Sequence, residues 1–193
     1  MLPEERLLLE RAQHRNVEAF EKLMRPYEPH LFRLVLALAR NREDAEDALQ
    51  EVLLRAYKSL PTFRGDSALL TWLTRIALNT TRNWLRSQSR TRWGDRVPHA
   101  DPSACDEHTD PTRNLVVEQD RQALREALRR IPDRYRAPLI MRHYQEMSYA
   151  DIADVLESPV GTVRSRLAQG RALLLRRLRA IGHSAFGDEE RFG

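Results

Sequence analysis

The stretch from Ser148 to Arg171 reads SYADIADVLESPVGTVRSRLAQGR, and its pattern predicts two helices joined by a tight turn. Ser148 suits the position that caps the first helix, and Asp151 three residues later completes an approximate capping box. Pro159 pre-sets the backbone for entry into the second helix, which we expect to begin at Gly161 or the residue after it. The stretch therefore predicts a helix-turn-helix.

The second of these helices has two distinct faces. Its apolar and small residues recur every three or four positions and predict one buried stripe, made of Val163, Leu167, Gly170, Leu174 and Leu178. The opposite face carries Arg164, Ser165, Ala168, Gln169 and Ala172. Arginine and glutamine form paired hydrogen bonds with base edges, and small residues allow close approach to a major groove. On spacing alone the alternative is an ordinary helical hairpin with a solvated basic face.

Composition restricts the class of protein. The 193 residues carry a net charge of +4, supplied almost entirely by arginine, since Lys22 and Lys58 are the only lysines. Two net-positive stretches, residues 1–93 and 118–181, flank a net-negative one at 94–117, which fits nucleic-acid-binding modules on a tether. The single Cys105 excludes an intramolecular disulfide framework. We find no signal peptide and no apolar run long enough for a membrane span, so we expect a cytoplasmic protein.

Helical periodicity runs through the rest of the chain, glycine is scarce, and no strand-like alternation persists. We therefore predict an all-α protein of two helical domains joined by a flexible linker. Residues 1–90 form the first domain, 91–117 an acidic linker rich in proline and aspartate, 118–181 the second domain, and 182–193 a tail. In the second domain we expect Asp133 to cap a helix whose inward residues are Tyr135, Leu139, Ile140 and Tyr144.

The first domain contains its own basic face. The loop PTFRGDS at residues 61–67 precedes a helix predicted from about 68 to 86, in which Trp72 and Trp84 are expected to join the core. Spacings of three and four place Arg75, Asn79, Arg82 and Arg86 on one outer face, with Asn83 beside it. Such a face, next to a loop in which Phe63 is an exposed aromatic, suits a displaced single strand whose phosphates and unstacked base need partners.

Three segments, taken together, resemble one family: DAEDALQEVLLRAYKSL (Asp44–Leu60), FRGDSALLTWLTRIALNTTRNWL (Phe63–Leu85) and MSYADIADVLESPVGTVRSRL (Met147–Leu167). Their order and the linker between them are similar to bacterial sigma factors of the extracytoplasmic-function (group IV) type, close to the sigma E branch. The resemblance covers residues 5–181. It implies a factor that binds core RNA polymerase and directs promoter-specific transcription initiation.

The resemblance also implies site residues. The first segment matches the part that docks on the β′ clamp helices, through Asp47, Gln50 and Glu51. The second matches the part that melts and reads the −10 element and holds a flipped base, through Arg55, Phe63, Arg64, Asp66, Ser67, Arg75, Ile76, Asn79, Arg82 and Asn83. The third matches the part that reads the −35 element, through Arg142, Thr162, Arg164, Ser165, Arg166, Ala168, Gln169 and Arg171.

Partners follow from the same resemblance. It implies contacts with the β flap and promoter DNA, passage of the acidic linker through the RNA-exit path, and control by an anti-sigma factor, often membrane-associated. Free of these partners, the chain is expected to be a monomer that binds promoter DNA weakly, because its two readers are not held at promoter spacing. We expect no catalytic residues, no cofactor and no metal, because His99, Cys105 and His108 lack a paired ligand motif.

Three other functions would use similar sequence features. A response regulator would need an input domain with strand–helix alternation, which the first half lacks. A metal-dependent nuclease would need converging carboxylates, which the basic stretches almost lack. An adaptor that uses the acidic helix without reading DNA is the third rival, and it predicts that Arg164→Ala leaves promoter use unchanged.

Overall fold

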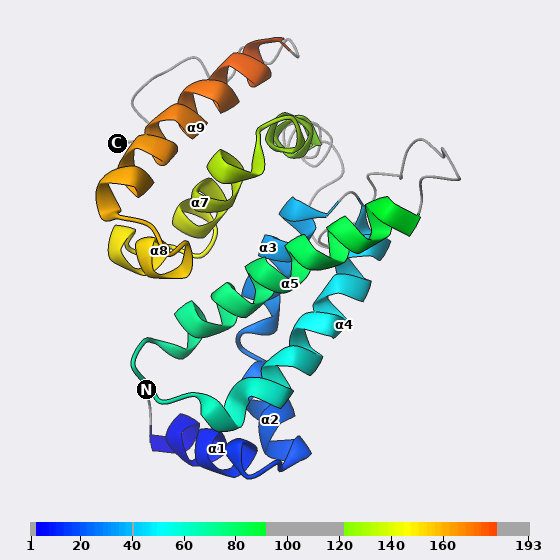
Figure 1. The fold of residues 1–193 in the computed structure, drawn as a ribbon, viewed down its shortest axis with the longest axis vertical. Helices are drawn as coiled ribbons and strands as arrows, with labels where there is room; N and C mark the ends of the chain where they lie inside the picture. The colour runs from blue at the N-terminus through cyan, green and yellow to red at the C-terminus, as the bar shows by residue number, and fades with distance from the viewer. Residues whose placement is uncertain (1–2, 40, 92–121, 181–193) are drawn as a thin grey trace, which may run out of the picture.

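The computed structural model describes residues 3–39, 41–91 and 122–180, and every regular element in these ranges is a helix (Figure 1). The predicted all-α class of two helical domains is therefore confirmed for the described part of the chain. The proposed linker from residue 92 on, the tail, and His99, Cys105 and His108 lie outside the described residues. None of the described helices has the length and apolar character needed to cross a membrane.

The first domain is a bundle of α1 (Pro3–Gln13), α2 (Val17–Met24), α3 (Glu28–Leu38), α4 (Arg42–Ser59) and α5 (Leu69–Thr91), with a short 3-10 turn, η1 (Leu60–Thr62), after α4. Asparagine caps set two of the helix starts. The Asn16 side chain accepts from the Ala19 N–H at 2.8 Å, and the Asn41 side chain accepts from the Asp44 N–H at 2.6 Å. Both caps satisfy backbone donors that a helix start leaves free.

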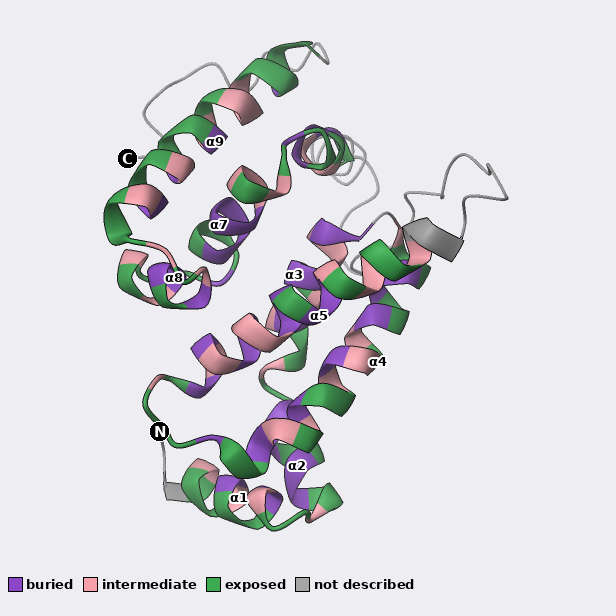
Figure 2. Cartoon of the chain, viewed as in Figure 1, coloured by how far each residue is buried: buried purple, intermediate pink, exposed green. Residues whose placement is uncertain are grey.

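The core of this bundle lies where α3, α4 and α5 meet (Figure 2). Its fully buried side chains are Leu31, Leu34, Val35, Val52, Leu60, Leu73 and Leu78. Trp72 and Trp84 are partly buried and pack against this core, as their positions predicted. Asp44, in the first turn of α4, is an acidic residue that is nevertheless buried, at 4% exposure.

The second domain comprises a helix over 122–129, α7 (Asp133–His143), α8 (Tyr149–Val155) and α9 (Val160–Ala180). The capping box of α8 is confirmed: the Asp151 N–H donates to Ser148 Oγ at 3.1 Å, and the Ser148 N–H donates to Asp151 Oδ2 at 3.3 Å. α9 begins one residue earlier than predicted, because the Pro159 carbonyl accepts from both Thr162 and Val163.

Two expectations for α7 are wrong. Its N-cap is Pro132, which has no side-chain acceptor, and the Asp133 carboxylate accepts instead from Arg82 of the first domain. Tyr144 lies at the C-terminal end of α7 and is 41% exposed rather than inward. Leu139 and Ile140 are buried as expected, whereas Tyr135 is only partly buried.

The two domains pack directly on one another. α3 contacts α7 and α5 contacts α8, so that α7 and α8 lie against the first bundle (Figure 1). Buried residues of both domains, among them Leu31 and Ile140, belong to one continuous apolar cluster. A polar contact also joins the domains: Gln145 is only 5% exposed, and its Nε2 donates to the backbone carbonyl of His30 at 3.2 Å.

Candidate nucleic-acid interface

The residues predicted to form the outer face of α9 are exposed, Ala172 included. Arg164, Ser165, Ala168 and Gln169 are exposed, and Val163, Leu167 and Gly170 are buried on the opposite side. Ser165 Oγ donates to the Thr162 carbonyl at 2.9 Å. The resulting face combines a guanidinium, an amide and small side chains along one helix, and groups of these kinds are able to form hydrogen bonds with base edges in a major groove.

The start of α9 is fixed by the turn before it. Glu157 adopts a left-handed backbone conformation, with φ of 48°, and lets the chain reverse between α8 and α9. Arg166 Nη1 lies 3.3 Å from Ser158 Oγ, and Arg166 and Thr162 are both only partly exposed. Of the predicted −35 residues, Arg166 therefore contacts the turn, and Thr162 is less exposed than the residues on the outer face.

A second group of basic residues flanks this face. Arg142 donates to the Met147 carbonyl at 3.0 Å, and its guanidinium lies 5.3 Å from the centre of the Tyr149 ring. Burial, together with the positive charges of Arg171 and Arg142, holds the pKa of His143 below its ordinary value. Arg142 of α7 and Arg171 of α9 therefore both lie close enough to His143 to act on its charge, although 29 positions separate the two arginines in the chain.

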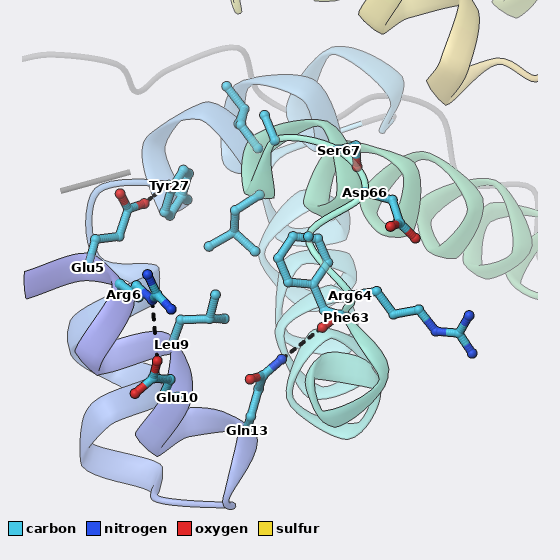
Figure 3. Close-up of a pocket in the computed structure, with 14 residues that line it drawn as sticks. Glu5, Arg6, Leu9, Glu10, Gln13, Tyr27, Phe63, Arg64, Asp66 and Ser67 are labelled. Atoms are coloured by element: carbon cyan, nitrogen blue, oxygen red, sulfur yellow. Dashed lines mark hydrogen bonds and ion pairs between the residues drawn. The ribbon is translucent and has the colours of Figure 1, made fainter. Parts of the chain in front are cut away.

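The loop before α5 borders a cavity of about 770 Å³ (Figure 3). α1 forms the opposite wall with Glu5, Arg6, Leu9, Glu10 and Gln13, and the loop contributes residues from Phe63 to Leu70. Arg64, Asp66 and Ser67 line it, and Gly65 turns the loop with φ of 79°. The sequence did not predict any involvement of α1, because α1 precedes the loop by some fifty residues.

Phe63 differs from the prediction. It was expected to be an exposed aromatic, but it is only 9% exposed, and its ring centre lies 5.1 Å from that of Trp72. The ring is buried because Trp72 of α5 offers it an apolar surface at the base of the loop. Phe63 therefore anchors the loop, and Arg64, Gly65 and Asp66, which follow it directly, are exposed.

Several of the other predicted −10 residues are not part of the cavity lining. The cavity lining does not include Arg55, Ile76, Asn79 or Asn83. The predicted −10 residues therefore do not all border one cavity. Asn79 and Asn83 are exposed and Ile76 is partly exposed on α5. Arg55 Nε is paired with Glu51 Oε1 at 2.7 Å on α4.

Arg75 and Arg82 have partners in the second domain. Arg75 Nη2 lies 2.7 Å from Asp154 Oδ2, and Arg82 Nε lies 2.7 Å from Asp133 Oδ2. Both side chains are on the outer face of α5, as predicted, but in this arrangement carboxylates occupy the donors that would serve phosphates.

The predicted docking residues share one face of α4. Asp47 and Gln50 are exposed, and Glu51 is partly exposed. Leu54, one turn further along, is 46% exposed and lies on the same face, since it follows Gln50 by four residues and Glu51 by three. The sequence analysis missed Leu54, although an apolar residue outside the buried stripe of an amphipathic helix is a detectable signal.

Two stretches of the chain match models of known families. Residues 23–91 match Sigma-70 region 2, and residues 121–174 match Sigma-70, region 4. The chain is 33% identical over 185 residues to the RNA polymerase sigma-H factor of Pseudomonas aeruginosa, covering 90% of this chain and 93% of that protein. It is 34% identical over 178 residues to the ECF RNA polymerase sigma-E factor of Escherichia coli, covering 86% and 90%.

Solved structures share the fold. CnrH in complex with the cytosolic domain of CnrY gives a TM-score of 0.66 at 22% identity, covering 92% of this chain and 98% of that chain. The sigma factor RpoE in complex with the anti-sigma factor NepR, from Bartonella quintana, gives 0.69 at 22% identity, covering 83% and 96%.

The chain belongs to the sigma-70 family, within its extracytoplasmic-function group of RNA polymerase sigma factors. It is accordingly an alternative sigma factor that acts in transcription initiation.

Among the described residues, no group of three or more His, Cys, Asp or Glu side chains is placed to hold a metal ion.

Proposed function

We propose that this sigma factor reads promoters with two separate surfaces. Residues 118–181 read the −35 element with the outer face of α9. Residues 1–90 capture the melted −10 strand with α5 and the loop that precedes it. The observation that carries the proposal is the exposed row of Arg164, Ser165, Ala168 and Gln169 along one face of α9, backed by a buried apolar stripe.

The docking surface for core polymerase is assigned to α4. Asp47, Gln50 and Glu51 present polar and acidic groups, and the exposed Leu54 adds an apolar contact at the same place. A polar face with a single apolar centre is typical of a protein interface, where a few buried anchors supply most of the binding free energy. We assign this face to the β′ clamp helices, and the second domain and the linker to the β flap and the RNA-exit path.

The proposal includes a protein inhibitor. In their solved structures, CnrH is bound by the cytosolic domain of CnrY and RpoE by the anti-sigma factor NepR. A comparable anti-sigma factor, associated with the membrane, is the partner we expect to hold this chain inactive in the cytoplasm. The chain itself is proposed to be a monomer. We propose no enzymatic activity and no cofactor for it, because binding to polymerase and to promoter DNA is enough for the proposed function.

The test is transcription in vitro with purified core polymerase and a library of promoter fragments, with and without the protein. We expect new start sites that depend on both components and share −10 and −35 sequences. Arg164→Ala should then reduce use of those promoters that keep the shared −35 sequence. If no start site depends on the added protein, or if Arg164→Ala leaves every promoter unchanged, the proposed reading surfaces are wrong.

A further inference from the structure

The outer face of α9 continues well beyond the residues that we assign to base contacts. Ala172 follows Ala168 by four positions, and Arg176 and Arg179 follow Ala172 by four and by seven. Side chains at these spacings lie on one face of a helix. Ala172, Arg176 and Arg179 are all exposed. The face that begins at Arg164 therefore runs to the last turn of α9, and its distal part carries two arginines.

The back of this distal part is covered by packing. Leu178 is buried in a cluster with Ala123 and Ala127, so the helix over 122–129 lies against the last turns of α9. Leu178 lies about 200° around the helix from Arg176, at about 100° per residue. α9 also lies on the side of α7 and α8 that is away from the first bundle (Figure 1). The face with the two arginines is therefore open in the free chain.

The distal half of α9 is strongly basic. Residues 171–180 read RALLLRRLRA, with four arginines and no acidic residue. On the covering helix, Glu126 is paired with Arg130 of its own stretch at 3.5 Å. Within the described part of the chain, no ion pair joins Arg176 or Arg179 to a carboxylate. Two guanidinium groups without an acidic partner favour a polyanion as their ligand.

The length of α9 places these arginines at the edge of the groove that its first turns would enter. The helix has 21 residues and is therefore about 31 Å long, whereas a major groove is about 12 Å wide. Arg176 lies about 10 Å along the axis from Gln169, and Arg179 lies about 15 Å from it. A helix that reads base edges from Arg164 to Gln169 therefore extends to the phosphates that border the groove.

Duplex DNA fits this face better than an acidic protein does. Protein interfaces are centred on a few buried aromatic or apolar anchors. The exposed side chains of residues 171–180 are only alanine and arginine. The arginines also lie on the same face as the base-reading positions, so a duplex held by those positions runs past them.

We propose that Arg176 and Arg179 form a second DNA-binding surface on α9, which binds backbone phosphates of duplex DNA whatever its sequence. The inference rests on the proposed reading face, because that face sets where the duplex lies. It adds that the second domain holds DNA by two phosphate contacts beyond its base contacts. Each phosphate that is neutralised releases condensed counterions, so these contacts weaken steeply as salt is raised.

The first experiment measures the salt dependence of binding and needs no specific sequence. The full chain is titrated into a fluorescein-labelled duplex of mixed sequence, followed by anisotropy, between about 50 and 200 mM salt. The logarithm of the binding constant falls with the logarithm of the salt concentration by about 0.9 for each phosphate contact. Arg176→Ala with Arg179→Ala should make this slope less steep by about two and weaken binding at about 0.1 M salt roughly ten-fold or more.

Two further variants control for loss of charge alone. Arg177→Ala removes the same charge from the same helix, at least about 100° around it from Arg176 and from Arg179. It should change the slope by clearly less than Arg176→Ala or Arg179→Ala does. Arg176→Lys with Arg179→Lys should keep the slope, because an ammonium group also neutralises a phosphate. All three positions are exposed and alanine favours a helix, so the variants should fold.

The second experiment locates the contacts on the DNA. In a duplex that carries the −35 sequence, single phosphates are replaced one at a time by uncharged methylphosphonates. For the unaltered chain, replacements at a few phosphates bordering the groove should weaken binding several-fold. The Arg176→Ala, Arg179→Ala double variant should not respond to those replacements, and it should still respond to replacements at other contacted phosphates.

Three results would overturn the inference. An unchanged salt slope in the double alanine variant would mean that the arginines do not contact phosphates. Identical methylphosphonate profiles would mean that they act only through long-range charge. Unchanged DNA binding with weaker transcription in the presence of core polymerase would assign them to an acidic protein surface instead. By contrast, an unaltered chain that shows no −35 preference would count against the proposed function and would leave the difference in salt slope intact.

Discussion

Gln13 is hydrogen-bonded to the backbone of the loop that precedes α5. Its Nε2 donates to the Phe63 carbonyl at 2.8 Å and lies 3.4 Å from the Leu60 carbonyl, although 50 positions separate Gln13 from Phe63 (Figure 3). The Gln13 amide thus connects α1 to the backbone at both ends of the 3-10 turn. Gln13 itself precedes residues 23–91, the segment that matches Sigma-70 region 2. We infer that Gln13 positions the loop for the melted strand.

Replacing this amide by a carboxylate of the same shape tests that inference. Gln13→Glu removes the donor and places a negative charge beside two carbonyl oxygens, which should lower the free energy of unfolding by about 1 kcal/mol. Promoter opening should fall, measured by permanganate reactivity of the −10 strand, while binding of duplex −35 DNA stays unchanged. Glu10→Gln, on the same helix and the same cavity, is the matched control and should open promoters normally.

The exposed Leu54 predicts an apolar anchor in the docking face. Leu54→Glu should weaken binding to core polymerase by about 1.5–3 kcal/mol, the free energy of burying a leucine side chain at an interface. Competition with a labelled sigma factor for core polymerase measures the loss. Leu7→Glu is the control, because Leu7 is 58% exposed on α1, outside the docking face. Equal effects of the two changes would remove Leu54 from the interface.

Local chemistry explains why the helices could be predicted from the sequence. Ser148 and Asp151 form a capping box from side chains three residues apart. Helical spacing alone predicts that Val163 of α9 is buried and that the next residue, Arg164, is exposed. The same reasoning separated the two domains and gave the exposed face of α9.

Long-range packing explains what could not be predicted. Phe63 is buried against Trp72. The Asp133 carboxylate does not cap its helix and instead accepts a hydrogen bond from Arg82, 51 positions away. Nothing within one helical turn of either residue signals such a partner. For the same reason the sequence pointed to Arg75 and Arg82 as DNA contacts but gave no sign that carboxylates of the other domain also bind them.

The face of α9 predicts the effect of removing its first arginine. Arg164→Ala should cost about 1–3 kcal/mol in binding to duplex DNA that carries the −35 sequence, and it should relax the preference at a single base pair. Arg177→Ala, in the last turn of α9, removes the same charge far from the reading positions and should weaken all sequences alike. Titrations of the cognate site and of single-base variants distinguish the two. A uniform loss for Arg164→Ala would mean a phosphate contact instead of a base contact.

The buried side of α9 predicts how closely it must approach α7. A Cβ atom added to Gly170 would lie 3.0 Å from Leu139 Cδ1 and 3.2 Å from the Tyr135 carbonyl oxygen. Leu139 is itself buried and has little room to move, so Gly170→Ala should destabilise the chain by about 1–3 kcal/mol. Gly161, on the same helix, has nothing within 4 Å of its added Cβ.

Gly161→Ala is therefore the matched control. It should leave the free energy of unfolding unchanged or raise it by up to about 1 kcal/mol, because alanine favours a helix more than glycine does. Urea denaturation of the full chain measures both variants. Since α7 supports α9 from behind, the displacement in Gly170→Ala should also weaken −35 binding, although no residue on the outer face has changed. If Gly170→Ala is as stable as Gly161→Ala, the two helices can separate freely, and the close packing at Gly170 does not set the position of the reading face.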